Sequence, residues 1–292
     1  MGGQNPPLRL NRPDTSGFSN GGNQEIVIKM NKLLLAIDIG NTNIVVGVFD
    51  GDKIRATWRI ATSVHRTADE YASILLNLLP RKGINPDNIK SAILCSVVPP
   101  LEPTFEMMCQ NYFNIAPLVI GVGIKTGVRI STDNPREVGA DRIVNAMAAH
   151  HLYGGPLIVI DLGTATTFDA VSKDGDYLGG AIAPGIEIAA EALFTRTAKL
   201  PRVELQVPKK AIGRNTVASM QSGIVFGYIG LIEAIVTRFR QELGEHTKTI
   251  ATGGYSILLG RETSCIDNVN MDLTLIGLRL IHDLNQPHQE SR

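Results

Sequence analysis

The sequence predicts an α/β fold built from two similar domains, and three observations carry this prediction. Residues 36–50 contain an apolar run that ends at Asp38, a polar turn and a second apolar run. Residues 157–171 repeat the same order around Asp161. Strand-like and helix-like patterns alternate through the rest of the chain, which is typical of α/β proteins. Two such hairpins at comparable points of the chain indicate that one domain has been duplicated.

The first hairpin has a turn whose residues suit a phosphate ligand. Gly40 has no Cβ and lets the backbone approach a ligand closely, and Asn41, Thr42 and Asn43 supply hydrogen-bonding side chains. Asp38, at the strand end, can hold Mg²⁺ together with phosphate oxygens. The turn contains no Walker A motif. An ordinary hairpin with a polar turn has the same appearance, so one copy alone does not decide its function.

The second copy changes this interpretation, since two Asp-x-Gly-Thr-type hairpins that face each other can bind a nucleoside triphosphate from both sides. The pair resembles the phosphate-binding hairpins of the superfamily that contains acetate and sugar kinases, heat-shock ATPases and actin. This resemblance implies a duplicated two-domain actin-like (ribonuclease H-like) fold with a nucleotide cleft between the halves.

Composition narrows the class of protein. The chain has 292 residues, 28 basic and 28 acidic, so its formal net charge is zero and nothing indicates a nucleic-acid partner. No uninterrupted apolar run reaches the roughly 18 residues of a membrane span, so no membrane partner is expected. The three cysteines match no paired metal spacing and are interpreted as thiols of a protein in the reducing cytoplasm: Cys95, Cys109 and Cys265.

Four segments are expected along the chain. Residues 1–30 are rich in Gly, Pro, Asn and Ser and lack the apolar core of a signal peptide, so they are predicted to be a disordered leader. Residues 31–150 form the predicted first domain and residues 151–285 the second. Residues 286–292 are a polar tail.

The first half continues with a predicted third antiparallel strand at residues 53–61 and a helix that begins at Thr67, with Glu70 completing a capping box. A buried strand, a helix and a short strand are predicted at residues 92–98, 101–113 and 117–120.

The segment 132–142 is predicted to start another helix. Asn134 is expected to cap it, Pro135 to occupy its first turn and Glu137 to follow three residues after the cap. Asp141 and Arg142 then lie in the early turns, where a helix favours an anionic ligand. The alternative is an ordinary surface ion pair on an amphipathic helix.

The second half ends with a long predicted helix and a Gly-Gly turn. The helix, residues 217–243, carries Gly227 and Gly230, which suit close packing within the subunit or across a dimer. The turn Gly253-Gly254 can lie flat against an adenine or a ribose, or be only a turn. The other elements are expected at residues 177–185 and 249–252 (strands) and 187–194, 255–260 and 274–284 (helices).

Six motifs occur in an order that resembles the type III pantothenate kinases: D-I-G-N-T-N, N-P-x-E-V-G-A-D-R, D-x-G-T-A-T-T, G-G-x-I-x-P-G, G-x-N-T-x-x-x-M-Q-S-G and A-T-G-G. The resemblance extends from Met30 to about Leu284. It implies the phosphorylation of pantothenate by ATP to 4'-phosphopantothenate, the first step of coenzyme A biosynthesis. It also implies a homodimer, Mg²⁺ and a monovalent cation, K⁺ or NH₄⁺.

The resemblance also assigns roles to individual residues. Asp141 is the expected general base, Asp161 the ligand of the monovalent cation and Thr164 a contact to ATP. Thr132 stands where many relatives have a tyrosine that lines the substrate pocket. The expected phosphate loop for ATP comprises Asp38, Ile39, Gly40, Asn41, Thr42, Asn43, Ile44 and Val45, and the expected pantothenate contacts are Gly139, Ala140, Asp141, Arg142 and Thr216.

The predicted chemistry agrees with these residue types. A primary hydroxyl that attacks a phosphoryl group needs a carboxylate to accept its proton, and Asp141 suits that role. Arg142 suits the substrate carboxylate. Two alternatives stay open, namely another small-molecule kinase of the same superfamily and a non-catalytic regulator like the Bvg accessory factors, which share these motifs. The motif G-A-D-R argues against the first, and intact phosphate hairpins with zero net charge argue against the second.

Overall fold

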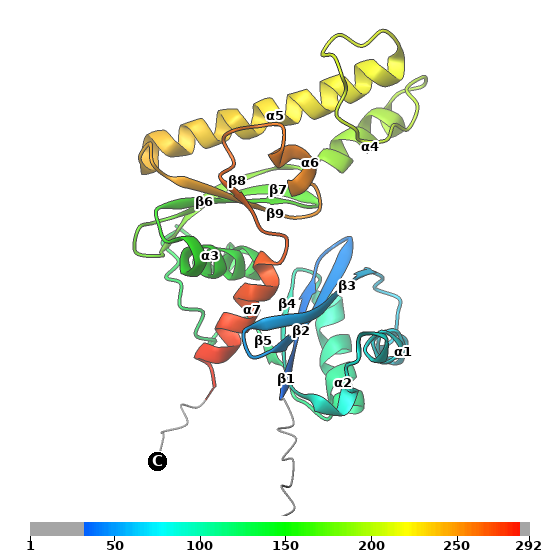
Figure 1. Cartoon of the computed structure of the whole chain (residues 1–292), viewed down its shortest axis with the longest axis vertical. Coiled ribbons are helices and arrows are strands. Elements are labelled where there is room, and N and C mark those ends of the chain that lie inside the picture. Colours follow the sequence, from blue (N-terminus) through cyan, green and yellow to red (C-terminus); the bar gives the residue numbers. More distant parts are fainter. Residues whose placement is uncertain (1–31, 287–292) are drawn as a thin grey trace, which may run out of the picture. The chain divides into compact units, whose positions relative to one another are not determined.

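The computed structural model describes residues 32–286, so the predicted leader and nearly all of the predicted tail lie outside the described residues. Two five-stranded sheets form the framework (Figure 1). The first has the order β3-β2-β1-β4-β5 and the second the order β10-β9-β6-β7-β8. The strands are β1 (Leu33–Ile39), β2 (Asn43–Asp50), β3 (Lys53–Ala61), β4 (Ile89–Ser96), β5 (Leu118–Val119), β6 (Leu157–Leu162), β7 (Ala165–Val171), β8 (Tyr177–Pro184), β9 (Lys248–Thr252) and β10 (Asn268–Val269).

The two sheets repeat one topology. In each, three consecutive strands pair antiparallel, and the fourth lies parallel to the first. Reading the second order in reverse gives the order of the first, strand for strand. The prediction of a duplicated α/β, actin-like fold is therefore confirmed.

Successive side chains of a strand point to opposite faces of the sheet, so the two faces of the first sheet pack against different helices. Leu35 and Ile37 of β1 pack with helices α1 (Ala68–Leu78) and α2 (Glu102–Phe113). Leu34 and Ala36, which point to the other face, pack with α7 (Leu273–Leu284). The first sheet is thus buried on both faces, as its nearly continuous apolar strands require.

The second sheet follows the same rule. Leu157 and Val159 of β6 pack with α3 (Ala140–Tyr153), whereas Ile158 and Ile160 pack with α5 (Thr216–Leu243). Figure 1 shows α3 and α5 on opposite faces of this sheet. Two shorter helices, α4 (Ile186–Arg196) and α6 (Ser256–Gly260), lie near α5.

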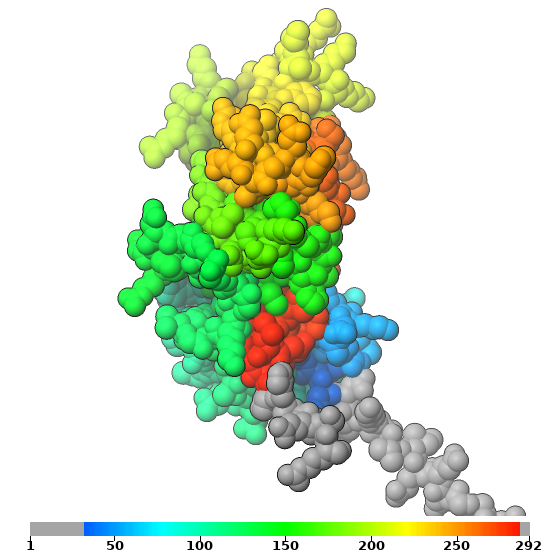
Figure 2. Space-filling view, turned by 90° about the vertical axis from the view of Figure 1, so that its left-hand side faces the viewer, coloured from blue at the N-terminus to red at the C-terminus, as the bar shows by residue number. Residues whose placement is uncertain are grey.

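Helix α7 joins the core of the first sheet to α3. Leu275 and Leu278 pack in one cluster with Leu34 of β1 and Val144 of α3. Gly277 permits the helix crossing, because a Cβ there would overlap the carbonyl of Val144. In Figure 2, α7, in red, lies beside the blue residues of the first sheet, with green residues of the middle of the chain on its other sides. A division of the chain at residue 150 stays a prediction.

The predicted helix start at Asn134 is wrong. The Asn134 side chain donates to the Glu137 carboxylate at 2.6 Å and caps no backbone N–H. Residues Pro135–Glu137 form only a 3-10 turn, and Val138 is extended. Helix α3 begins at Ala140, with Gly139 as its N-cap. The capping box of α1 is confirmed, since Thr67 and Glu70 bond each other's backbone N–H.

Candidate functional site

The two predicted phosphate turns contact each other. The hydroxyls of Thr42 and Thr164 lie 2.8 Å apart, although 122 residues separate them in the chain. Gly40 closes the first turn with a hydrogen bond from its N–H to the Asn43 carbonyl, and a Cβ at Gly40 would lie 2.8 Å from that oxygen. The first turn therefore needs glycine at this position, because any side chain would press on its own hydrogen bond.

The side chains of the predicted phosphate loop divide into two groups. Ile39 and Ile44 lie in the core between the first sheet and its helices, and Val45 packs on the opposite side. Ile39 and Ile44 are buried and can reach a nucleotide only through their backbone, whereas Val45 is partly exposed. Asn41 and Thr42 are exposed and available to a ligand.

Three aspartates lie near these turns and interact through their negative charges. Burial, together with the charges of Asp141 and Asp161, raises the pKa of Asp38 to about 8. Burial, together with the charges of Asp141 and Asp169, raises the pKa of Asp161 to about 7. Carboxyl groups that repel one another inside a protein are stabilised by a bound cation, so this cluster has the chemistry of a cation site.

Asp161, near the end of β6, lies against α3 and the turn that follows β9. It points to the face of the second sheet that α3 covers, and Asn145 of α3 donates to its Oδ2 at 3.3 Å. Its Oδ1 lies close to the turn that follows β9, since a Cβ at Gly253 would come within 2.5 Å of this oxygen. Gly253 also has a φ of +89°, which favours glycine.

Asp141 lies in the first turn of α3, as predicted from the sequence. Its Oδ1 accepts a hydrogen bond from the backbone N–H of Arg142 at 2.9 Å. Burial raises its pKa, while this hydrogen bond and the Arg142 charge oppose the shift. A raised pKa makes a carboxylate a better proton acceptor at neutral pH.

Arg142 is bound by a buried acid that sequence reasoning did not single out. Its Nε donates to Asp169 Oδ1 at 2.7 Å, and its Nη2 lies 2.6 Å from the same oxygen. Tyr177 also donates to Asp169, at 2.8 Å, and its ring lies under the guanidinium. Asp169 is fully buried. Part of the Arg142 donor fork is therefore occupied within the protein.

Two other predicted residues have different surroundings. The Thr132 hydroxyl is buried and has no hydrogen-bond partner among residues 32–286, so it is available to a ligand. Thr216 is the first residue of α5, the helix that covers the face of the second sheet opposite α3. The structure does not bring Thr216 to Asp141 within one chain.

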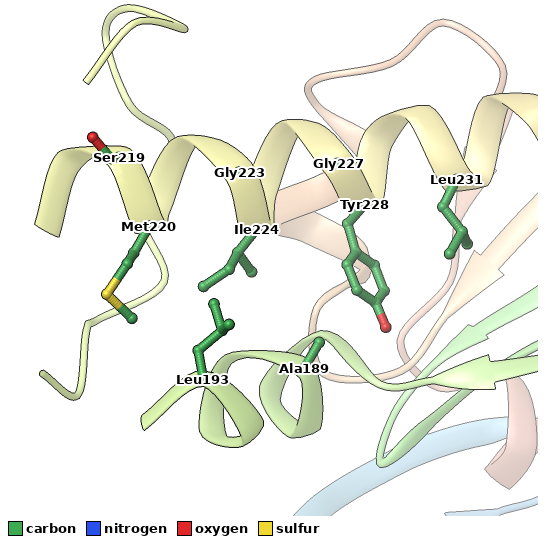
Figure 3. Close-up of a pocket in the computed structure, with 9 residues that line it drawn as sticks. All are labelled: Ala189, Leu193, Ser219, Met220, Gly223, Ile224, Gly227, Tyr228 and Leu231. Atoms are coloured by element: carbon green, nitrogen blue, oxygen red, sulfur yellow. The ribbon is translucent and has the colours of Figure 1, made fainter. Parts of the chain in front are cut away.

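An apolar pocket lies elsewhere, between α4 and α5. In Figure 3, Leu193 and Ala189 of α4 point toward Ile224 and Tyr228 of α5. This pocket has no acidic residue in its lining, unlike the site around Asp38. Its lining consists of Ala189, Leu193, Ser219, Met220, Gly223, Ile224, Gly227, Tyr228 and Leu231.

Within residues 32–286, no group of three or more His, Cys, Asp or Glu side chains could by itself hold a metal ion. Asp38 and Asp161 supply only carboxylate oxygens. This set fits a hard cation that completes its coordination with phosphate oxygens and water, as Mg²⁺ does.

Sequence reasoning missed Asp169, Asn145 and Arg59. Asp169 carried a signal, because it is the one charged residue in the return strand that follows the second turn. Asn145 follows Asp141 by one helical turn on a face that is otherwise apolar. No pattern in the sequence pointed to Arg59, since it is one of several polar residues at alternate positions of an ordinary strand.

Comparisons with known proteins agree on one family. A family model described as type III pantothenate kinase matches residues 34–238. A type III pantothenate kinase from Dehalococcoides mccartyi is 54% identical over 257 residues, which cover 88% of this chain and all of that protein. One from Moorella thermoacetica is 54% identical over 253 residues, which cover 87% of this chain and all of that protein.

Solved structures show the fold at lower identity. A protein from Campylobacter jejuni described as a conserved Baf family transcriptional activator has a TM-score of 0.56 and 20% identity, over 86% of this chain and 98% of that one. The ethanolamine utilization protein EutJ from Carboxydothermus hydrogenoformans has a TM-score of 0.50 and 15% identity, over 85% and 89% of the two chains.

Proposed function

The chain belongs to the type III pantothenate kinase family, and we propose that its two phosphate turns and Asp141 perform the ATP-dependent phosphorylation of pantothenate that begins coenzyme A biosynthesis. The observation that carries this assignment of residues is the meeting of the two turns at Thr42 and Thr164, beside three mutually repelling aspartates. Phosphoryl transfer mainly requires aligned reactants and neutralised charge, and this arrangement provides for both.

Asp141 is the proposed general base. It accepts the proton of the pantothenate hydroxyl as that oxygen bonds to the γ-phosphorus and the bond to ADP breaks. Its position at the start of α3 and its raised pKa support this role. A Cβ at Gly139 would lie 2.6 Å from Asp141 Oδ1, so glycine at this helix end makes room for the Asp141 carboxylate.

Arg142 is proposed to bind the pantothenate carboxylate with the part of its guanidinium that Asp169 does not occupy. Asp169 and Tyr177 hold the guanidinium in one orientation, which lowers the entropy lost on binding. The unpartnered hydroxyl of Thr132 is proposed to be a further contact to the same substrate.

Cations are proposed at the two buried carboxylates. Asp38 would hold Mg²⁺ with the phosphates of ATP, and Asp161 would hold K⁺ or NH₄⁺ beside Asn145. Support comes from the burial and the neighbouring acidic charges that raise the pKa of both carboxyls, because a bound cation would offset the cost of ionising them. A bound cation would supply charge neutralisation for the transferring phosphoryl group.

A homodimer is also proposed, with α4 and α5 at its interface. Gly223, Gly227 and Gly230 of α5 have open space where a Cβ would lie. Apolar side chains are exposed on the same two helices, including Ile188, Phe194 and Val217. A second copy would cover this surface. It would also explain Thr216, which could contact pantothenate only in a partner subunit, because the second sheet separates it from Asp141 in its own chain.

The assignment is tested by ATP-dependent phosphate transfer to pantothenate, with wild type, Asp141→Asn and Asp174→Asn. Asp174 is an exposed control carboxylate on the hairpin after β7. We expect the wild type to form 4'-phosphopantothenate and Asp141→Asn to lose about 100- to 10,000-fold in kcat, the range of general-base catalysis. Equal activity of the two variants would contradict the proposal that Asp141 is the general base.

Exchange of K⁺ and NH₄⁺ for Na⁺ tests the monovalent cation in the same assay. A wild type that binds ATP but phosphorylates no pantothenate in any of these ions would contradict the activity. Sugars and small acids would then be the acceptors to test.

A further inference from the structure

Arg59 lies on a strand whose end is hydrogen-bonded to the first phosphate turn. It lies on β3 opposite Val45 of β2 in the sheet register. Where β3 ends, Thr62 donates its hydroxyl to the Gly40 carbonyl at 2.7 Å, and its N–H bonds the Thr42 carbonyl at 3.0 Å. The strand that carries Arg59 and the turn predicted to bind phosphate therefore form one hydrogen-bonded unit.

The Arg59 side chain extends from the first sheet to the second. A Cβ at Gly254, in the turn after β9, would lie 3.2 Å from Arg59 Nη1. The preceding residue, Gly253, packs against Asp161. The guanidinium therefore lies against the same turn that contacts the proposed cation ligand.

The charge of Arg59 acts on both buried carboxylates of the site. Its positive charge opposes the rise in the pKa of Asp38 and of Asp161. Arg59 is exposed, and it has no hydrogen bond or ion pair with any residue in the range 32–286. Arg55 on the same strand pairs with Asp50, and Arg142 pairs with Asp169. Arg59 thus keeps all of its donors available to a ligand between the two turns.

We propose that Arg59 is a catalytic residue that donates hydrogen bonds from its guanidinium to the γ-phosphoryl group of ATP during transfer. In this step the pantothenate hydroxyl oxygen bonds to the γ-phosphorus, its proton passes to Asp141, and the bond to the ADP oxygen breaks with its electron pair leaving on ADP. Charge spreads over the equatorial oxygens in the transition state, and a planar guanidinium fork matches two of them. This inference rests on the phosphate site proposed above.

The variants Arg59→Met and Arg59→Lys test it, with Arg55→Met as the matched control on the same strand. We expect Arg59→Met to lower kcat about 100-fold or more, because a preorganised donor to the transition state is removed. KM for ATP and Kd for ADP should change by less than about 5-fold. Arg59→Lys should recover part of the rate, and millimolar guanidinium should partly restore an Arg59→Ala variant. Arg55→Met should keep the wild-type rate.

Three results would overturn the inference while the wild type still makes 4'-phosphopantothenate. The first is an Arg59→Met variant whose kcat stays within about 3-fold of the wild type. The second is a raised KM for ATP with an unchanged kcat, which would mean that Arg59 binds ATP equally well in the ground state and the transition state. The third is an Arg59→Met variant whose kcat recovers fully at higher pH. That result would mean that Arg59 acts only by keeping Asp38 and Asp161 ionised. An inactive wild type would instead contradict the kinase assignment itself.

Discussion

At the scale of single residues, the site brings together buried carboxyl groups whose ionised forms destabilise the folded protein. Asp38, Asp141 and Asp161 repel one another, and burial makes their ionised forms costly. Asn145 and Arg59 relieve only part of this cost. Groups that destabilise the free protein are expected at a site that binds cations, because the bound cation removes the repulsion.

This cost predicts how stability depends on pH. An unfolded chain ionises Asp near pH 4, whereas the folded protein holds its proton on Asp38 up to about pH 8. The folded state binds more protons between these values, so the free energy of unfolding falls as pH rises from about 4 to 8. Without nucleotide or divalent cations, Asp38→Asn should raise Tm at pH 8 by at least about 5 °C and leave it unchanged near pH 4.

Thermal unfolding followed by circular dichroism at both pH values measures this effect, with Asp174→Asn as the control. A lower Tm for Asp38→Asn at pH 8 would show that the Asp38 charge is compensated within the free protein.

At the scale of elements, the turn between β9 and α6 packs closely against Asp161 and Leu162 at the end of β6. Gly253 has a φ of +89°, and a Cβ there would lie 2.5 Å from Asp161 Oδ1 and 2.6 Å from the Leu162 carbonyl carbon. Gly254 has no positive φ, and a Cβ there would meet only the flexible end of Arg59 at 3.2 Å. The two glycines serve different purposes, although they are adjacent.

Alanine substitutions should separate these purposes. Gly253→Ala strains both the backbone and the contact with β6, so we expect it to cost about 3 kcal/mol and to lower Tm by about 6–12 °C. Gly254→Ala should keep Tm within about 2 °C and lower kcat, because it displaces Arg59. Differential scanning calorimetry and the kinase assay measure the two effects. Equal loss of Tm in both variants would contradict this division of roles.

At the scale of the whole molecule, α5 is a long apolar helix that its own chain covers only in part. By length and composition it could span a membrane, and only 39% of its most apolar window is buried. Its buried side packs on the second sheet through Val225, Ile232 and Val236. The other side is lined by glycine and borders the pocket in Figure 3. Such a face suits close contact with an identical helix of a second copy.

Gly227→Arg tests this assembly without disturbing the chain itself, because a Cβ at Gly227 meets no atom within 4 Å. We expect the wild type to elute as a dimer and the variant as a monomer in size-exclusion chromatography with light scattering. Gly121→Arg is the matched control, since Gly121 also has open space around its Cβ position. A variant that remains dimeric would place the interface elsewhere.

The sequence by itself determined the duplicated topology and most of the elements. Apolar period and turn residues act locally, so the two hairpins, the capping box of α1 and the long helix α5 were predictable. The family and its reaction were also predictable, since the motifs preserve the residue types that phosphoryl transfer requires.

Only the tertiary structure decided which side chains meet. Asp169 binds Arg142 because β7 and α3 face each other, and Arg59 reaches Gly254 because the two sheets approach there. Thr216 is separated from Asp141 because α5 and α3 cover opposite faces of one sheet. Helix α3 begins at Ala140 and not at Asn134, since the Asn134 side chain bonds Glu137 and caps no backbone N–H. The positions of Asp169, Arg59 and Thr216 depend on packing between segments distant in the chain, which no local pattern encodes. The Asn134–Glu137 bond is local, but it competes with the backbone capping that the sequence pattern also allowed.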